Sequence, residues 1–93
     1  QVVTPLTFSL DQNYPNPFNP RTKISFWLPI VSHVTLKVYN LTGKEIAILA
    51  DNESMNIGKH EIEFDATFLS SGAYFYRLIS EIFSQTKKLV LLK

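Results

Sequence analysis

The 93-residue sequence contains no cysteine, only three glycines and only two histidines. Without cysteine, the chain has no disulfide framework, no cysteine-ligated zinc and no thiol nucleophile. Acidic and basic residues nearly balance, at eight and nine, so the basic excess typical of a nucleic-acid-binding domain is missing. No apolar run approaches the ~20 residues that a membrane-spanning helix requires. We therefore expect a soluble domain that binds no nucleic acid and does not span a membrane.

What the sequence does have is a concentration of proline: three of its five prolines lie within residues 12–20, Gln-Asn-Tyr-Pro-Asn-Pro-Phe-Asn-Pro, which we call the strap. Proline fixes φ and keeps the preceding residue out of the helical region. Asparagine satisfies backbone groups in turns through its side chain. A flexible linker would use glycine and serine instead, and the strap contains neither. We predict a stiff, extended brace that lies against the rest of the domain.

Apolar and polar residues alternate along much of the remaining chain, most clearly at residues 22–29 and 33–40. This alternation is typical of strands that bury one face. Six or seven strands are predicted in all, at residues 7–10, 22–29, 33–40, 45–50, 60–65, 73–80 and 86–92, with a polar loop at 51–58. Strands at spacings of roughly ten residues predict an all-β fold, an immunoglobulin- or fibronectin-III-like β-sandwich of about seven antiparallel strands.

A glycine-x-tyrosine step opens the predicted strand at residues 73–80. Gly72 would supply a backbone conformation that a β-carbon disfavours. Tyr74 follows two residues later, where a tyrosine can return its hydroxyl to the preceding connection, as in the tyrosine corner of β-sandwiches. We therefore expect Tyr74 to be mostly buried and hydrogen-bonded.

The sequence offers little material for catalysis or metal binding. His33 and His60 stand near the starts of separate predicted strands, without a surrounding ligand set. Glu61, Glu63 and Asp65 share one strand face and could hold calcium or act as acid and base. A solvated outer face explains them better, because no nucleophile or glycine-rich loop accompanies them. We expect no catalytic residue, no metal site and no cofactor.

Aromatic residues provide a candidate binding surface. Trp27, Tyr39 and Phe75 fall on the strand faces opposite the predicted core. Aromatic rings exposed in a row could stack sugars or form a partner surface, so a carbohydrate-binding accessory module of a secreted hydrolase stays open as a function. The alternative is that the strap covers these rings, because Tyr14 and Phe18 must bury their own rings somewhere.

Three segments resemble the type A C-terminal sorting domain of the type IX secretion system. The strap with its flanks, from Leu10 to Phe26, is similar to the opening of that family; Gly72 and Tyr74 match its glycine-x-tyrosine element, and residues 86–93 resemble its end. The resemblance covers residues 8–93. The same opening and glycine-x-tyrosine strand also resemble the immunoglobulin-like domain of the flagellar hook-capping protein, so a structural assembly module is an alternative function.

The resemblance to the sorting family implies a non-catalytic signal that directs a larger protein of Bacteroidota through the outer membrane. Residues 1–7 would then be the end of a linker from the cargo, and residues 8–93 the sorting domain. The implied partners are the outer-membrane translocon and a sortase-like peptidase that cleaves near or upstream of residues 1–7. The cargo would pass through the periplasm and be secreted or attached to the cell surface.

The resemblance also implies which residues a partner recognises. They are the family's proline-x-proline element, its glycine-x-tyrosine element and its basic end: Pro15, Asn16, Pro17, Gly72, Tyr74, Lys87, Lys88 and Lys93. The basic end has a structural alternative, because charges on a terminal strand discourage edge-to-edge aggregation. As a functional element, it could be read by a partner through strand addition or charge.

Overall fold

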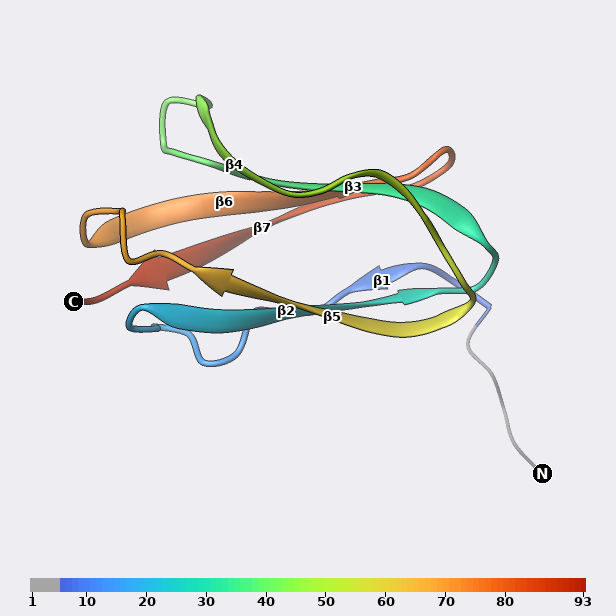
Figure 1. The fold of residues 1–93 in the computed structure, drawn as a ribbon, viewed down its shortest axis with the longest axis horizontal. Coiled ribbons are helices and arrows are strands. Elements are labelled where there is room, and N and C mark those ends of the chain that lie inside the picture. Colours follow the sequence, from blue (N-terminus) through green and yellow to red (C-terminus); the bar gives the residue numbers. More distant parts are fainter. Residues whose placement is uncertain (1–5) are drawn as a thin grey trace.

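The computed structural model describes residues 6–93, which form seven strands in two layers (Figure 1). One layer is a three-stranded sheet in the order β1-β2-β5, formed by β1 (Ser9–Leu10), β2 (Arg21–Leu28) and β5 (Gly58–Asp65). The other is a four-stranded sheet in the order β4-β3-β6-β7, formed by β3 (Ser32–Tyr39), β4 (Glu45–Met55), β6 (Gly72–Ile79) and β7 (Ser84–Leu91). All strand pairs are antiparallel, and the described residues form no helix. The predicted all-β sandwich is confirmed.

The core lies between the two sheets, where the alternating residues of each strand meet. In β2, Ile24, Phe26 and Leu28 point inward and are at most 1% exposed. The buried apolar side chains of the core are Leu10, Phe18, Ile24, Phe26, Leu28, Val34, Leu36, Val38, Ala50, Phe64, Ala66, Tyr74, Tyr76, Leu78, Leu89 and Leu91. Because a strand turns successive side chains to opposite faces, this alternation alone accounts for the burial of the central strands.

β4 is longer than the sequence predicts. The polar loop expected at residues 51–58 is wrong except at residues 56–57, because β4 continues to Met55 and β5 begins at Gly58. After shifts in register the strand continues along β3, placing Glu53 opposite Val34 and Met55 opposite Ser32. Asn52 adopts a φ of 50°, a left-handed conformation that asparagine tolerates. β4 is an edge strand, and its residues 51–54 are all exposed. This part of the strand therefore lacks the alternation of apolar and polar residues from which a strand can be predicted.

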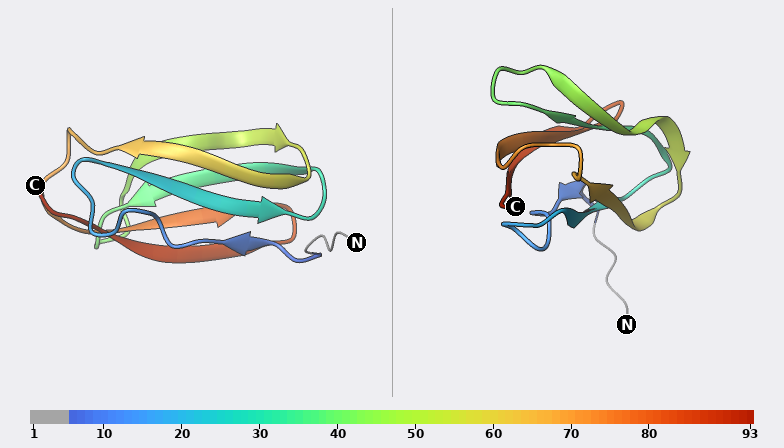
Figure 2. Two further views of the ribbon diagram at one scale, coloured as in Figure 1. Left: turned by 90° about the horizontal axis from the view of Figure 1, so that it is seen from below. Right: turned by 60° about the vertical axis from the view of Figure 1, so that its left-hand side comes forward.

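The two long sides of the sandwich are closed differently (Figure 2). On one side β4 and β5 end their sheets as edge strands. On the other side, β1 covers only the end of β2, pairing Leu10 with Phe26. Beyond β1 the strap follows, and it occupies the edge between β2 and β7.

Candidate partner-recognition site

The strap first follows the edge of β2, in continuation of β1. The Tyr14 N–H donates to the Lys23 carbonyl at 3.0 Å, and the Lys23 N–H donates to the Tyr14 carbonyl at 2.9 Å. The chain then bends at residues 15–17 and again at 19–20, so it is not the extended segment that the sequence predicts. These bends carry the strap from the three-stranded sheet towards the four-stranded one.

The second half of the strap binds the end of β7. The Phe18 N–H donates to the Val90 carbonyl at 3.0 Å, and the Leu92 N–H donates to the Phe18 carbonyl at 2.9 Å. The Asn16 side-chain oxygen accepts the Val90 N–H at 3.0 Å. The Phe18 ring is buried, and its centroid lies 6.3 Å from that of Phe64 across the sandwich. The strap therefore joins one edge of each sheet.

A buried polar network lies beneath the strap. The Tyr76 hydroxyl accepts the Asn13 N–H at 2.8 Å and donates to the Asp11 carbonyl at 2.6 Å. The Asn13 side-chain amide donates to the Thr22 hydroxyl oxygen at 3.0 Å, and the Thr22 hydroxyl donates to the Pro15 carbonyl at 2.9 Å. Asn13 and Thr22 are each only 2% exposed, and burial raises the pKa of Tyr76 to about 12. This network holds the first half of the strap to β2 and β6.

Sequence reasoning missed Tyr76 and Asn13 as the residues that hold the strap. A signal for Tyr76 was present: it lies two residues after Tyr74 and two before Leu78, on the inward face of the predicted strand. A buried tyrosine hydroxyl needs a hydrogen-bond partner. The sequence contained no comparable signal for Asn13, which is one of several polar residues in an irregular segment.

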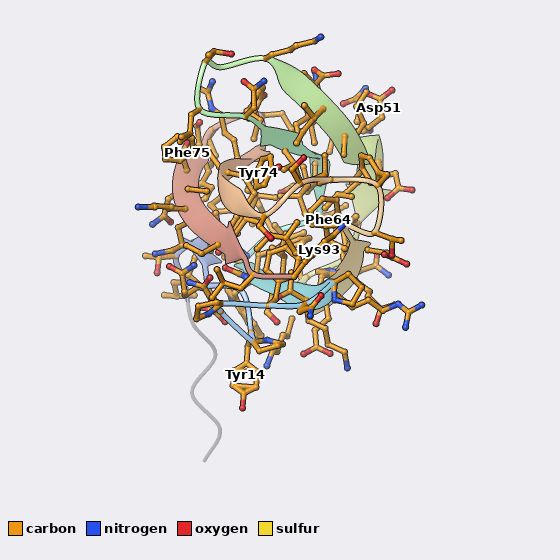
Figure 3. The ribbon with its side chains drawn as sticks, turned by 90° about the vertical axis from the view of Figure 1, so that its left-hand side faces the viewer. Tyr14, Asp51, Phe64, Tyr74, Phe75 and Lys93 are labelled. Carbon is orange, nitrogen blue, oxygen red and sulfur yellow. The ribbon has the colours of Figure 1, made fainter. Side chains whose placement is uncertain are left out.

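The glycine-x-tyrosine element lies at the same end of the sandwich as the end of β7 (Figure 3). Gly72 has a φ of 154° and stands opposite Leu91 in register. Tyr74 is 9% exposed, and its hydroxyl donates to the Ser70 carbonyl at 2.6 Å. The predicted burial and hydrogen bond of Tyr74 are confirmed.

The three lysines of the basic end have different surroundings. Lys93 is exposed, and its ammonium donates to the Thr67 carbonyl at 2.6 Å. Lys87 is half-buried in β7, whereas Lys88 is exposed and its carbonyl accepts the Gln12 side-chain amide at 2.6 Å. The chain end is therefore held on one side by the strap and on the other by the connection before β6.

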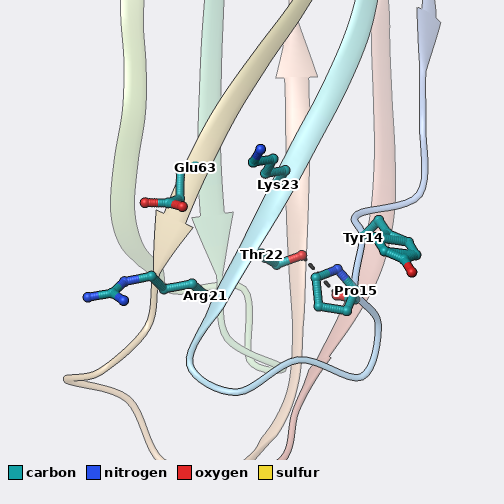
Figure 4. A pocket seen from close by; sticks show the side chains of 6 residues that line it. All are labelled: Tyr14, Pro15, Arg21, Thr22, Lys23 and Glu63. Atoms are coloured by element: carbon teal, nitrogen blue, oxygen red, sulfur yellow. Dashed lines mark hydrogen bonds between the residues drawn. The ribbon is translucent and has the colours of Figure 1, made fainter.

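A hollow of about 250 Å³ opens between the strap and β2 (Figure 4). It is lined by Tyr14, Pro15, Arg21, Thr22, Lys23 and Glu63. Tyr14 is 78% exposed, so the expectation that its ring is buried is wrong. The hollow has charged groups of both signs and is open to a partner's side chains.

The structure separates the three aromatic residues of the predicted sugar platform. Trp27 lies on the outer face of the three-stranded sheet, whereas Tyr39 and Phe75 face each other across β3 and β6 in the four-stranded sheet. All three are half-buried. They do not form one row, and the hydrogen bonds of the strap go to the sheet edges rather than across these rings.

The histidines make structural contacts. The ring of His33 lies 3.4 Å from the Glu81 carboxylate, and the ring of His60 stacks on Phe26 with centroids 5.5 Å apart. Within residues 6–93 no three His, Asp or Glu side chains gather in a way that could hold a metal ion. The same residues include no helix long and apolar enough to cross a membrane.

These features define the class of the protein: a small β-sandwich whose candidate site is the surface built by the strap and β7. The chain matches the family model of the secretion system C-terminal sorting domain over residues 12–92, and it belongs to that family. The match begins at the first residue of the strap and ends one residue after β7. No curated protein matches the chain. Family membership makes the domain a sorting signal for type IX secretion and part of a larger cargo that is secreted or bound to the cell surface.

Proposed function

We propose that the outer-membrane translocon binds this domain at the surface formed by the strap and β7 and exports the attached cargo from the periplasm. One observation supports this proposal above the others: the proline-x-proline element and the basic end, far apart in sequence, lie side by side. Asn16 and Val90, 74 positions apart, are joined by a hydrogen bond. A partner could therefore contact both family elements at once.

The residues of this surface have two kinds of role in the proposal. Pro15, Asn16 and Pro17 are exposed and present a shape fixed by proline. Lys88, whose carbonyl binds Gln12 of the strap, and Lys93 at the chain end would supply positive charge that attracts acidic groups of the translocon and guides its approach. The domain contributes recognition and no catalysis.

Gly72 and Tyr74 would act indirectly. Tyr74 is buried, so its ring is not available to a partner. Its hydrogen bond to Ser70 and the pairing of Gly72 with Leu91 instead hold the end of β7 in place. Lys87, half-buried in the same strand, would contribute charge at the rim of the surface.

We further propose that a sortase-like peptidase cuts before the domain, near or upstream of residues 1–7, so that the cargo is released or attached to the cell surface. Leu6 is 86% exposed, whereas the ring of Phe8 stacks on Phe83 at 5.1 Å. Among the described residues packing thus begins at Phe8, which supports the proposal that residues 8–93 are the sorting domain and residues 1–7 the end of a linker. Residues 1–5 lie outside the described part of the chain.

Export of a reporter tests the proposal. Residues 1–93 are fused behind a reporter with an inner-membrane signal peptide, in a host that has type IX secretion. One variant replaces Lys88 and Lys93 with glutamine, and another replaces Asn16 with alanine. The matched control is Lys44→Gln, which removes one charge from the exposed turn before β4. Urea denaturation of each purified domain separates loss of recognition from loss of fold.

We expect the intact domain and the Lys44 variant to export the reporter, and the surface variants to leave most of it in the periplasm while remaining folded. A reporter retained in the periplasm by the intact domain would refute the sorting role. Equal export by folded surface variants would refute the proposed binding surface but leave the sorting role intact. Mass spectrometry of the exported reporter locates the cut; a reporter that keeps the whole domain would contradict cleavage.

A further inference from the structure

The outer face of the four-stranded sheet has a hollow that the sorting role does not explain. Tyr39 of β3 stands opposite Phe75 of β6, and Phe75 stands opposite Lys88 of β7. Figure 3 shows Phe75 on the outside of the sheet and Tyr74 on its inner side. The hollow has a volume of about 270 Å³ and is lined by Tyr39, Gly43, Phe75, Arg77 and Thr86.

Arg77 is the charged residue among those that line this hollow. Lys37 stands directly opposite Arg77, and like charges in such a pair destabilise a sheet. The Lys37 ammonium has a partner in the Glu45 carboxylate at 2.9 Å. Arg77 donates through Nε to the neutral hydroxyl of Ser84 at 3.0 Å, and no ion pair within residues 6–93 includes Arg77. Its terminal guanidinium nitrogens keep four further N–H donors for a ligand.

The outer face of the other sheet has the opposite character. Arg21 of β2 reaches the Asp65 carboxylate of β5 at 3.4 Å, and Lys23 stands opposite Glu63. Charges on that face are therefore matched across the strands by the chain itself. On the four-stranded sheet, Arg77 and Lys88 are exposed and have no carboxylate partner among the described residues, so both charges are available to an anionic ligand.

We propose that this face binds an acidic saccharide, with a sugar ring stacked on Phe75 and Tyr39 and a sugar carboxylate held by Arg77. Aromatic rings accept the apolar face of a sugar, and a guanidinium binds a carboxylate through two parallel hydrogen bonds. A peptide could not add here as a strand, because β6 is already paired with β3 and β7 along its two edges. Recognition must therefore come from side chains. This activity is independent of the sorting role.

Titration of the purified 93-residue chain with trigalacturonic acid tests the proposal, with neutral galactotriose as the matched control ligand. Binding is followed by amide chemical shifts and by calorimetry at low salt. The variants are Arg77→Gln and Phe75→Ser, and Lys23→Gln removes one charge from the opposite face. We expect the acidic sugar to shift amides of residues 39, 75 and 77. Arg77→Gln should weaken its binding about tenfold or more and Phe75→Ser should also weaken it, while Lys23→Gln should leave it unchanged.

Equal affinity for the acidic and the neutral sugar, or no binding of either, would overturn the proposal. So would equal weakening by Arg77→Gln and Lys23→Gln, because that result indicates non-specific attraction of an anion. A glutamate-rich peptide that binds more tightly than trigalacturonic acid, with shifts at the same residues, would assign the face to an acidic protein instead. Chemical shifts far from the mutated site show whether each variant keeps its fold.

Discussion

Replacing Tyr76 with phenylalanine removes one oxygen atom from beneath the strap. That oxygen accepts the Asn13 N–H and donates to the Asp11 carbonyl, and Tyr76 is completely buried. The Asn13 N–H would be left without a partner inside the protein, whereas Asp11 is exposed and its carbonyl can turn to water. Leaving a buried group unpaired costs about 1–3 kcal/mol. We therefore expect the free energy of unfolding to fall by about 2 kcal/mol.

For a domain of this size such a loss corresponds to a Tm lower by roughly 8–16 °C. Urea and thermal unfolding, followed by circular dichroism, measure both quantities, and hydrogen exchange of the Asn13 amide reports on the strap itself. Tyr14→Phe is the matched control, because it deletes the same atom from an exposed ring of the strap. It should change stability by less than about 0.5 kcal/mol. If Tyr76→Phe matches this control in stability and in exchange, the network does not hold the strap.

Two further predictions concern residues of β6. Burial raises the pKa of Tyr76 to about 12 from an ordinary value of 10.0, so between these pH values the unfolded chain has lost the proton that the folded chain keeps. Stability should fall over this range, by roughly 2–3 kcal/mol more in the wild type than in Tyr76→Phe when both are titrated with urea. Gly72→Ala meets no atom within 4 Å but imposes a side chain at a φ of 154°. It should cost about 1–3 kcal/mol in the same assay, and an unchanged midpoint would show that the backbone relaxes there without strain.

Strands with one buried face could be predicted from the sequence, and the outer half of β4 could not. In β2, Ile24 and Phe26 are buried on either side of the partly exposed Ser25, so the order of residues reveals the strand. The outer half of β4 has no buried face and is held by backbone pairing with β3, as at Glu53 opposite Val34. Such pairing leaves no trace in the order of apolar residues.

The sequence predicts that the strap braces the domain, but it does not predict which strands the strap contacts. Its contacts span much of the chain: Gln12 to Lys88 is 76 positions, and Asn13 to Tyr76 is 63. No local pattern encodes which strand edge such a segment meets. Tyr74, by contrast, was predictable because a local glycine-x-tyrosine step carries the signal for its hydrogen bond. Tyr14 is a second residue whose surroundings could not be predicted, and its ring is exposed. Apolar character predicts burial only where the fold provides an inner face for the side chain.

The same long-range contacts determine how truncation experiments must be read. Deleting residues 90–93 would remove the lysine at the chain end, but it would also remove the carbonyl that accepts the Phe18 N–H and the N–H groups that bind Asn16 and Phe18. The second half of the strap would lose its hydrogen bonds to β7, while every strap residue remained in the chain. Loss of export after such a deletion is therefore expected whether the partner reads the lysines, the prolines or both. Only substitutions that keep the backbone, such as glutamine for the exposed lysines, separate the recognised groups from the groups that build the surface.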